Sequence, residues 1–144
     1  MIGGVVVLEI YYGEGKGKER VCIGAAITAA LRDKNVLLVN FQQKVENYDK
    51  LFDVAPHLTR LTLEPNTGVR EYFDHAVRMA LSFQYSVLIL HGVFDSVDSG
   101  KLSAAEVYEF LSNAPDSIEI ICTGTSVQEK FLPLANEIVE MKQG

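Results

Sequence analysis

A chain of 144 residues with 48% hydrophobic and 22% charged residues has the composition of a globular protein, not of a disordered one. Its formal net charge of −6 argues against a general nucleic-acid-binding protein, because such proteins present a basic surface to phosphates. No apolar run approaches the ~18 residues of a membrane span, and the apolar start lacks the basic region of a secretion signal. We therefore expect one cytoplasmic domain over residues 1–144, with no nucleic-acid partner and no membrane segment.

The first part of the chain has the order strand, glycine-rich turn, helix, strand. Val5–Tyr11 is rich in β-branched and aromatic residues, and Val36–Asn40 belongs to a second apolar run, so both are predicted to be buried strands. Between them, Lys18–Arg32 places its apolar residues at helical spacing. This order is typical of a βαβ unit, in which the two strands are parallel.

The remainder of the chain continues the alternation of helices and strands. Gly68–Gln84 has helical periodicity, and the apolar runs Ser86–Leu90 and Ile118–Cys122 predict two further inner strands. Ser103 is a predicted helix N-cap, with Glu106 at the capping-box position. Weaker signals predict a short strand over Arg60–Leu63, a short helix over Ser126–Ala135 and an edge strand over Glu137–Lys142. The predicted fold is a three-layer α/β domain with a mostly parallel central sheet.

The stretch "GEGKGKER" (Gly13–Arg20) joins the first predicted strand to the first predicted helix. Glycines let backbone N–H groups approach a phosphate, the helix offers its positive end, and a lysine reaches the outer phosphates. The residues that meet these needs are Gly13, Gly15, Gly17 and Lys18, with Lys16 as a second cation. The stretch therefore predicts a nucleotide-binding turn and a P-loop NTPase-like fold, and an ordinary glycine-rich turn before a charged helix start is the alternative.

The residue after Lys18 departs from a standard phosphate-binding loop. A hydroxyl that binds Mg²⁺ usually stands there, and this chain has Glu19, followed by Arg20. A carboxylate about 4 Å from a phosphate charge costs on the order of 4 kcal/mol at an effective dielectric constant near 20. We therefore expect weak ATP binding, with the need for Mg²⁺ left open, unless Arg20 compensates or Glu19 turns to solvent.

Three segments resemble the P-loop branch of the ATP:corrinoid adenosyltransferases. "GEGKGKER" follows the family's loop, approximately G-N-G-K-G-K-T-T, and "GAAITAALRDKNVLLVNFQQK" is similar to its alanine-rich helix and the strand that follows. "KLSAAEVYEFLSNAPDSIEIICTGTSVQEKFLPLANEIVEMK" is similar to the family's last helix, T-G-R strand end and L-A-D-x-V-x-E-M ending. The resemblance implies that cobalt(I) of a reduced corrinoid attacks the 5′ carbon of ATP and that triphosphate leaves.

The resemblance also locates the departures from the family. Where the family has a strand ending in L-D-E, whose acidic pair serves the metal and the nucleotide, this chain reads Leu90-His91-Gly92, with Asp95 and Asp98 just beyond. The implied nucleotide-binding residues are Gly13, Gly15, Lys16, Gly17, Lys18, Glu19 and Arg20, and the implied auxiliary residues are Lys44, His91 and Asp95. No residue is assigned a catalytic role, and no metal site is predicted.

Several single residues have structural interpretations that compete with functional ones. His91 has no second His or Cys at ligand spacing, so a loop histidine is favoured over a metal ligand or general base. Asp98 with the Ser-Gly-Lys that follows favours a turn over an acidic cluster. Cys22 and Cys122 are predicted to be buried free thiols.

Two classes of function remain open for this sequence. The first is an adenosyltransferase that uses ATP and a corrinoid, and the second is a catalytically impaired relative that binds a nucleotide, another anion or a protein partner. The glycine-lysine loop favours a phosphate ligand in both classes. The loss of the acidic pair after Leu90 favours the second class.

A small chain of this family is also expected to form a homodimer. Sedimentation equilibrium at tens of micromolar is the appropriate measurement, because weak but specific interfaces are populated in that range. We expect a dimer mass, and a monomer at every loading concentration would contradict the expectation.

Overall fold

The computed structural model describes residues 7–15, 17–42, 57–82 and 84–142. The strands are β1 (Val7–Gly13), β2 (Val36–Asn40), β3 (Leu58–Thr62), β4 (Val87–His91), β5 (Glu119–Gly124) and β6 (Glu137–Met141). The helices are α1 (Gly17–Leu31), α3 (Val69–Ala80), α4 (Val93–Asp98), α5 (Ala104–Asn113) and the 3-10 helix η1 (Glu129–Leu134). Of the described helices, none is both long and apolar enough to cross a membrane.

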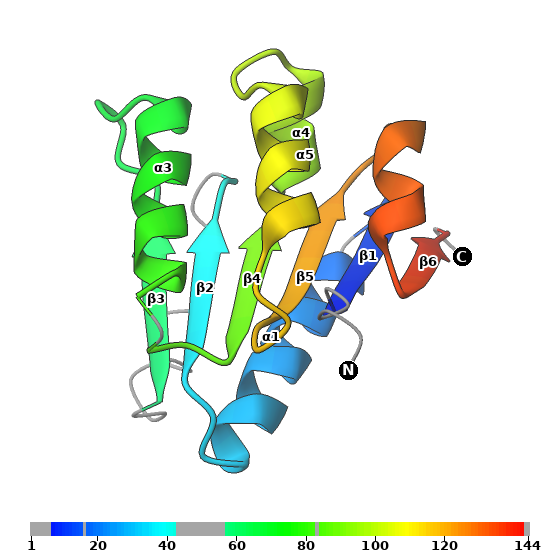
Figure 1. Cartoon of the computed structure of the whole chain (residues 1–144). Helices are drawn as coiled ribbons and strands as arrows, with labels where there is room; N and C mark the ends of the chain where they lie inside the picture. The colour runs from blue at the N-terminus through cyan, green and yellow to red at the C-terminus, as the bar shows by residue number, and fades with distance from the viewer. Residues whose placement is uncertain (1–6, 16, 43–56, 83, 143–144) are drawn as a thin grey trace.

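The strands form a single six-stranded sheet in the order β3-β2-β4-β5-β1-β6, and every neighbouring pair is parallel. Helix α1 lies on one face of this sheet, and α3, α4, α5 and η1 lie on the other (Figure 1). The expected three-layer α/β fold is confirmed, and the sheet is wholly parallel within the described residues.

The inner strands are apolar because both faces of the sheet are covered. Leu88 and Leu90 of β4 belong to the larger core, which includes side chains of α3, α4 and α5. Val87 and Ile89 alternate with them and belong to the smaller core beneath α1. Continuous apolar runs are therefore the pattern that a parallel sheet buried on both faces requires.

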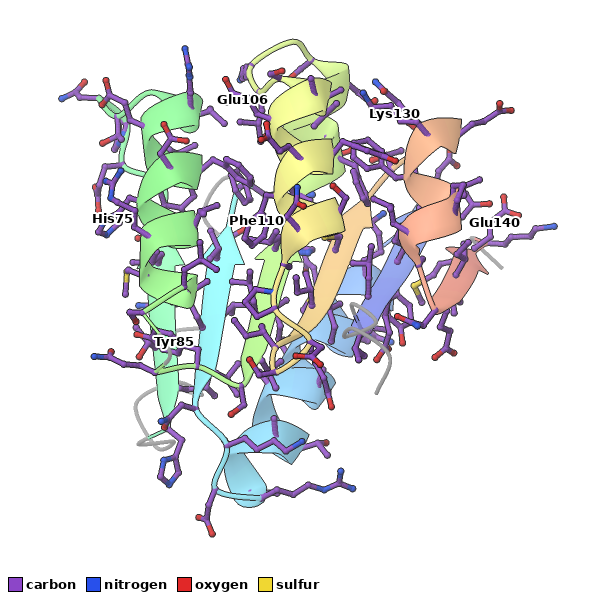
Figure 2. All side chains as sticks on the ribbon, viewed as in Figure 1. His75, Tyr85, Glu106, Phe110, Lys130 and Glu140 are labelled. Atoms are coloured by element: carbon purple, nitrogen blue, oxygen red, sulfur yellow. The ribbon has the colours of Figure 1, made fainter. Side chains whose placement is uncertain are left out.

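The larger core also joins the helices that cover its face. The rings of Phe73 in α3 and Phe110 in α5 meet edge to face with centroids 6.0 Å apart, and Phe110 points across the sheet toward α3 (Figure 2). Ser103 caps α5 as predicted, since its Oγ accepts a hydrogen bond from the Glu106 backbone N–H. The Glu106 carboxylate lies 3.1 Å from Nη2 of Arg70 and so links α5 to α3.

Two predicted helices differ from the structure in type or extent, and one helix was not predicted. Helix α3 ends at Ala80, before the predicted end at Gln84. The predicted last helix is the 3-10 helix η1, because Pro133 lies inside it and has no N–H for an α-helical hydrogen bond. Helix α4 was not predicted. Gly92 is its N-cap, and the positive φ of 81° at this glycine ends the strand before it.

The end of β1 packs closely against β6. Gly13 pairs with Met141 in the parallel register and has a φ of 129°, and a Cβ there would overlap the Met141 carbonyl oxygen. A Cβ on Gly17 would lie 2.7 Å from Cε of Met141. Gly13 is therefore required by sheet packing, whatever the loop binds, whereas the contact at Gly17 is with the end of a flexible side chain.

Exchanging Gly13 for alanine tests this packing. We expect Gly13→Ala to lower the free energy of unfolding on the order of 3 kcal/mol, because both the backbone conformation and the contact with β6 are lost. Gly24→Ala in α1 is the matched control, since no atom lies within 4 Å of its added Cβ. The control should raise stability by about 0.5–1 kcal/mol, as alanine does for glycine inside a helix. Urea denaturation measures both changes, and equal effects would contradict this account.

Candidate functional site

The Gly13–Arg20 stretch lies at the carboxyl edge of the sheet, between the end of β1 and the start of α1. Gly13 and Gly15 both have positive φ, 129° and 91°, which lets the chain reverse direction before α1 begins at Gly17. The backbone N–H groups of the first turn of α1 have no partner within their own helix, and the helix dipole is positive at this end. Lys16 lies outside the described residues.

Lys18 is folded back against its own loop. The side chain is 5% exposed, and its ammonium donates a hydrogen bond to the Gly13 carbonyl and lies 3.5 Å from the Gly15 carbonyl oxygen. A buried ammonium needs such acceptors because leaving water is otherwise costly. The lysine predicted to bind phosphate therefore also holds the loop in shape.

Glu19 and Arg20 follow in the first turn of α1 and differ in their surroundings. Arg20 is exposed, whereas Glu19 is partly buried. Burial raises the pKa of the Cys22 thiol to about 12, and the charge of Glu19 adds to that rise. The negative charge of Glu19 therefore acts on Cys22, a side chain in the core beneath α1.

His91 is the last residue of β4, so the prediction of a loop histidine was wrong. The strand extends one residue beyond the predicted end because His91 pairs with Asn40 of β2 in the parallel register. The side chain is 2% exposed, with Nδ1 2.8 Å from Oγ1 of Thr123 and 3.5 Å from Sγ of Cys22. Its Nε2 is buried and has no hydrogen-bond partner among the described residues.

The surroundings of His91 keep its ring uncharged. Burial, and to a smaller extent the charge of Lys18, lower its pKa from 6.5 to about 4, and the charge of Asp95 opposes them. The imidazole is therefore neutral at pH 7. Because the charge of Lys18 acts on the ring, the end of β4 and the glycine-lysine loop belong to one electrostatic environment.

Asp95 connects three segments at the same edge of the sheet. Its Oδ1 accepts a hydrogen bond from the Thr125 backbone N–H at 2.8 Å, and its Oδ2 accepts one from Nε2 of Gln42 at 3.1 Å. Asn40 in turn accepts a hydrogen bond from the Gln42 backbone N–H at 3.0 Å. Both carboxylate oxygens of Asp95 are thus engaged in holding the loops after β2 and β5.

The structure brings together some of the predicted site residues and adds others. Lys18, His91 and Asp95 share the carboxyl edge, whereas Lys44 lies outside the described residues. Asn40, Gln42 and Thr123 were not predicted. The sequence did indicate these residues, because each is a polar residue at or just after the end of an apolar strand, where parallel sheets bind ligands.

The residues at this edge do not fit Mg²⁺. The ion prefers oxygen ligands, and of the positions that correspond to the family's hydroxyl and acidic pair only Glu19 offers a side-chain oxygen here, because the others are His91 and Gly92. Asp98 accepts a hydrogen bond from Oγ of Ser126, so it is engaged elsewhere. Within the described ranges, no group of three or more His, Cys, Asp or Glu side chains is placed to hold a metal ion.

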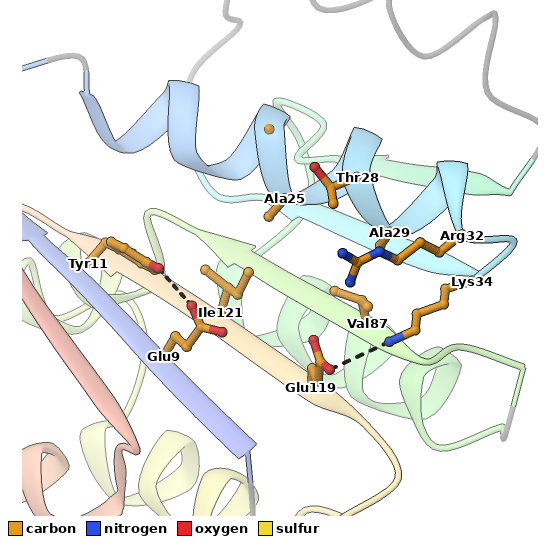
Figure 3. Close-up of a pocket in the computed structure, with 11 residues that line it drawn as sticks. Glu9, Tyr11, Ala25, Thr28, Ala29, Arg32, Lys34, Val87, Glu119 and Ile121 are labelled. Atoms are coloured by element: carbon orange, nitrogen blue, oxygen red, sulfur yellow. Dashed lines mark hydrogen bonds and ion pairs between the residues drawn. The ribbon is translucent and has the colours of Figure 1, made fainter.

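A separate hollow of about 250 Å³ lies between α1 and the sheet (Figure 3). Two pairs of side chains line it: Tyr11 donates a hydrogen bond to Glu9 at 2.7 Å, and Nζ of Lys34 lies 3.6 Å from Glu119. The hollow extends toward the amino end of β5, where Glu119 stands, and none of the predicted site residues lines it. It is therefore distinct from the edge that carries the glycine-lysine loop.

Comparison with known proteins identifies relatives along the whole described chain. A family model described as "ATP:corrinoid adenosyltransferase BtuR/CobO/CobP" matches residues 5–144. An uncharacterized protein of Nostoc sp. (strain PCC 7120) is 31% identical over an alignment that covers 94% of this chain and 43% of the Nostoc protein. Corrinoid adenosyltransferases of Escherichia coli K12 and O6:H1 are each 24% identical, covering 94% of this chain and 76% of theirs. This chain thus spans less than half the length of the Nostoc relative.

The lowered pKa of His91 predicts a specific pH dependence of stability. Between the ordinary pKa of 6.5 and the folded value of about 4, the unfolded chain binds more protons than the folded one. The stabilising contribution is therefore complete above pH 6.5 and is lost as the pH falls toward 4, by about 3 kcal/mol in all.

Urea unfolding of wild type and His91→Gln at pH 7 and pH 4.5 measures this contribution. The loss of stability on acidification should be smaller in His91→Gln than in wild type. His75→Gln, at an exposed position of α3, should behave as wild type. An equal loss in wild type and His91→Gln would show that His91 is not the group responsible.

Proposed function

This chain belongs to the ATP:corrinoid adenosyltransferase family, and on that premise we propose that it binds ATP at the Gly13–Arg20 stretch and transfers the adenosyl group to a reduced corrinoid. The proposal treats residues 1–144 as one P-loop-like domain. The observation that carries it is the position of Lys18, buried at the turn between β1 and α1 on the carboxyl edge of a parallel sheet. Ligands of open parallel sheets bind at this edge.

The groups at this turn suit a triphosphate. The free N–H groups and positive dipole end of α1 favour negative charge, and Lys18 adds a full positive charge beside them. Arg20 is exposed on the same first turn and supplies a further cation at the surface. Lys16 and Lys44 are part of the proposal as cations from the sequence, although they lie outside the described residues.

The proposed reaction needs charge stabilisation more than acid–base chemistry. The cobalt(I) of the corrinoid supplies the electron pair of the new Co–C bond to the 5′ carbon, and the C5′–O bond breaks with its electron pair leaving on triphosphate. Lys18 and the N–H groups of the turn would stabilise that leaving group, because preorganised donors in a partly buried site are effective where charge develops. No step is assigned to Mg²⁺, because no group of three or more His, Cys, Asp or Glu side chains among the described residues is placed to hold a metal ion.

A second candidate is a relative that binds a nucleotide, another anion or a protein partner without transferring the adenosyl group. His91 and Gly92 favour it, since they occupy the place where the family has its acidic pair. Asp95 also favours it, because both of its oxygens are engaged by Gln42 and Thr125 and are not available as substitutes.

One assay separates the two candidates. The chain is incubated with ATP and a chemically reduced corrinoid under anaerobic conditions, and adenosylcorrinoid and triphosphate are quantified. Equal amounts of both products, absent in Lys18→Ala, are the expected result. ATP binding by calorimetry without either product would favour the second candidate, and the absence of both binding and products would contradict both nucleotide-based proposals.

Exchanging Glu19 tests whether its carboxylate opposes the nucleotide. Glu19→Thr should tighten ATP binding by between about 1 kcal/mol, for a carboxylate in water at 4 Å from a phosphate, and about 4 kcal/mol, for one in a partly buried site. Glu71→Thr is the matched control, because Glu71 is also an acidic residue in the first turn of a helix. Calorimetric titration measures the change. An unchanged affinity in Glu19→Thr would mean that the carboxylate is turned away from the ligand.

A further inference from the structure

Three groups at the ends of β4 and β5 form a directed chain of hydrogen bonds. The Gly92 backbone N–H can only donate, so Oγ1 of Thr123 accepts from it at 2.8 Å. The hydroxyl proton of Thr123 then needs an acceptor, and Nδ1 of His91 lies 2.8 Å away. We assign Nδ1 as the acceptor of this proton, which leaves the proton of the neutral imidazole on Nε2.

The second neighbour of Nδ1 agrees with this assignment. Sγ of Cys22 lies 3.5 Å from Nδ1, and the pKa of about 12 keeps the thiol protonated at pH 7, so it too is a donor. Two donors therefore face Nδ1. The lowered pKa of His91 excludes the form in which both ring nitrogens carry protons.

The Nε2–H group is consequently a buried donor without an acceptor among the described residues. Only 2% of the surface of His91 is exposed to solvent, and its Nε2 atom is buried. Native proteins leave few such groups unpaired, because an unpaired buried donor destabilises the fold. The charge of Lys18 also acts on this ring, so the position favours an acceptor that carries negative charge.

A protonated ring nitrogen also determines what cannot bind there. A nitrogen that carries a proton has no lone pair for a metal ion, so Nε2 in this tautomer is not a ligand for a divalent cation. The same N–H is a good donor to a phosphate oxygen. The poor fit of Mg²⁺ at this edge and the unpaired Nε2–H donor thus both follow from the presence of His91 where the family has an acidic residue.

Resting on the proposed function, in which an anion binds at the Gly13–Arg20 stretch, we propose that His91 donates its Nε2–H to a phosphate oxygen of a polyphosphate ligand beside Lys18. The ligand is then bound as the metal-free anion. His91 is a binding residue in this proposal, and Thr123 and Gly92 position its proton.

Calorimetry with sodium tripolyphosphate and with ATP tests the proposal, each in EDTA and in excess MgCl₂. Both ligands should bind in EDTA at least as tightly as in MgCl₂. His91→Leu should weaken tripolyphosphate binding about 10-fold or more, as expected for the loss of one hydrogen bond to a charged group. His91→Gln should weaken it less, because the amide keeps an N–H donor, and His75→Leu on the exposed side of α3 should leave it unchanged.

The outcomes separate this inference from the proposed function. Binding of both ligands only in MgCl₂, or an affinity unchanged in His91→Leu, overturns the inference and leaves the ATP proposal standing. Binding of metal-free tripolyphosphate that depends on His91, without any binding of ATP, supports the inference and overturns the proposed function. No binding of either ligand overturns both.

A second measurement on the wild-type protein does not depend on the folding of a variant. The ¹⁵N chemical shifts of the His91 ring distinguish a protonated Nε2 from a protonated Nδ1. We expect the proton on Nε2 at pH 7, and a shift of the Nε2 resonance when tripolyphosphate is added. A proton on Nδ1, or no change at Nε2 on saturation with tripolyphosphate, overturns the inference.

Discussion

The parallel pairing of β1 with both β5 and β6 sets the geometry of the whole carboxyl edge. The register places Tyr11 beside Thr123 and Gly13 beside Met141, so the start of the glycine-lysine loop is fixed from two sides. The carbonyl of Gly13 accepts a hydrogen bond from the ammonium of Lys18. This contact keeps Lys18 close enough to His91 for its charge to lower the pKa of the ring. Backbone pairing between neighbouring strands thus decides which polar groups come together.

The polar groups at this edge form a network in which most positions have a defined donor or acceptor. Asp95 holds the loops after β2 and β5, Thr123 orders the ring of His91, and Lys18 is held by loop carbonyls. Such a network is rigid before any ligand arrives, which lowers the entropic cost of binding. At the end of β4, where the resemblance implies an acidic pair, this chain has the neutral His91 and Gly92, with the positive charge of Lys18 nearby.

Most of the fold was predictable because each inner strand is an apolar run that follows a turn or a helix. The site was less predictable for reasons visible in single residues. Helix α4 has only six residues, which follow its N-cap Gly92. Its sequence therefore shows too little helical periodicity to be distinguished from a turn. His91 and Thr123 meet because β4 and β5 are neighbours in the sheet, and Cys22 reaches His91 because α1 packs on the sheet, so nothing local in the sequence indicates these contacts.

The contact between Gly13 and β6 changes what a glycine motif means in a protein of this kind. Any side chain at Gly13 would meet the backbone of Met141, so sheet packing favours glycine there even in a chain that binds no nucleotide. The survival of the motif in a divergent relative is therefore no measure of its ligand.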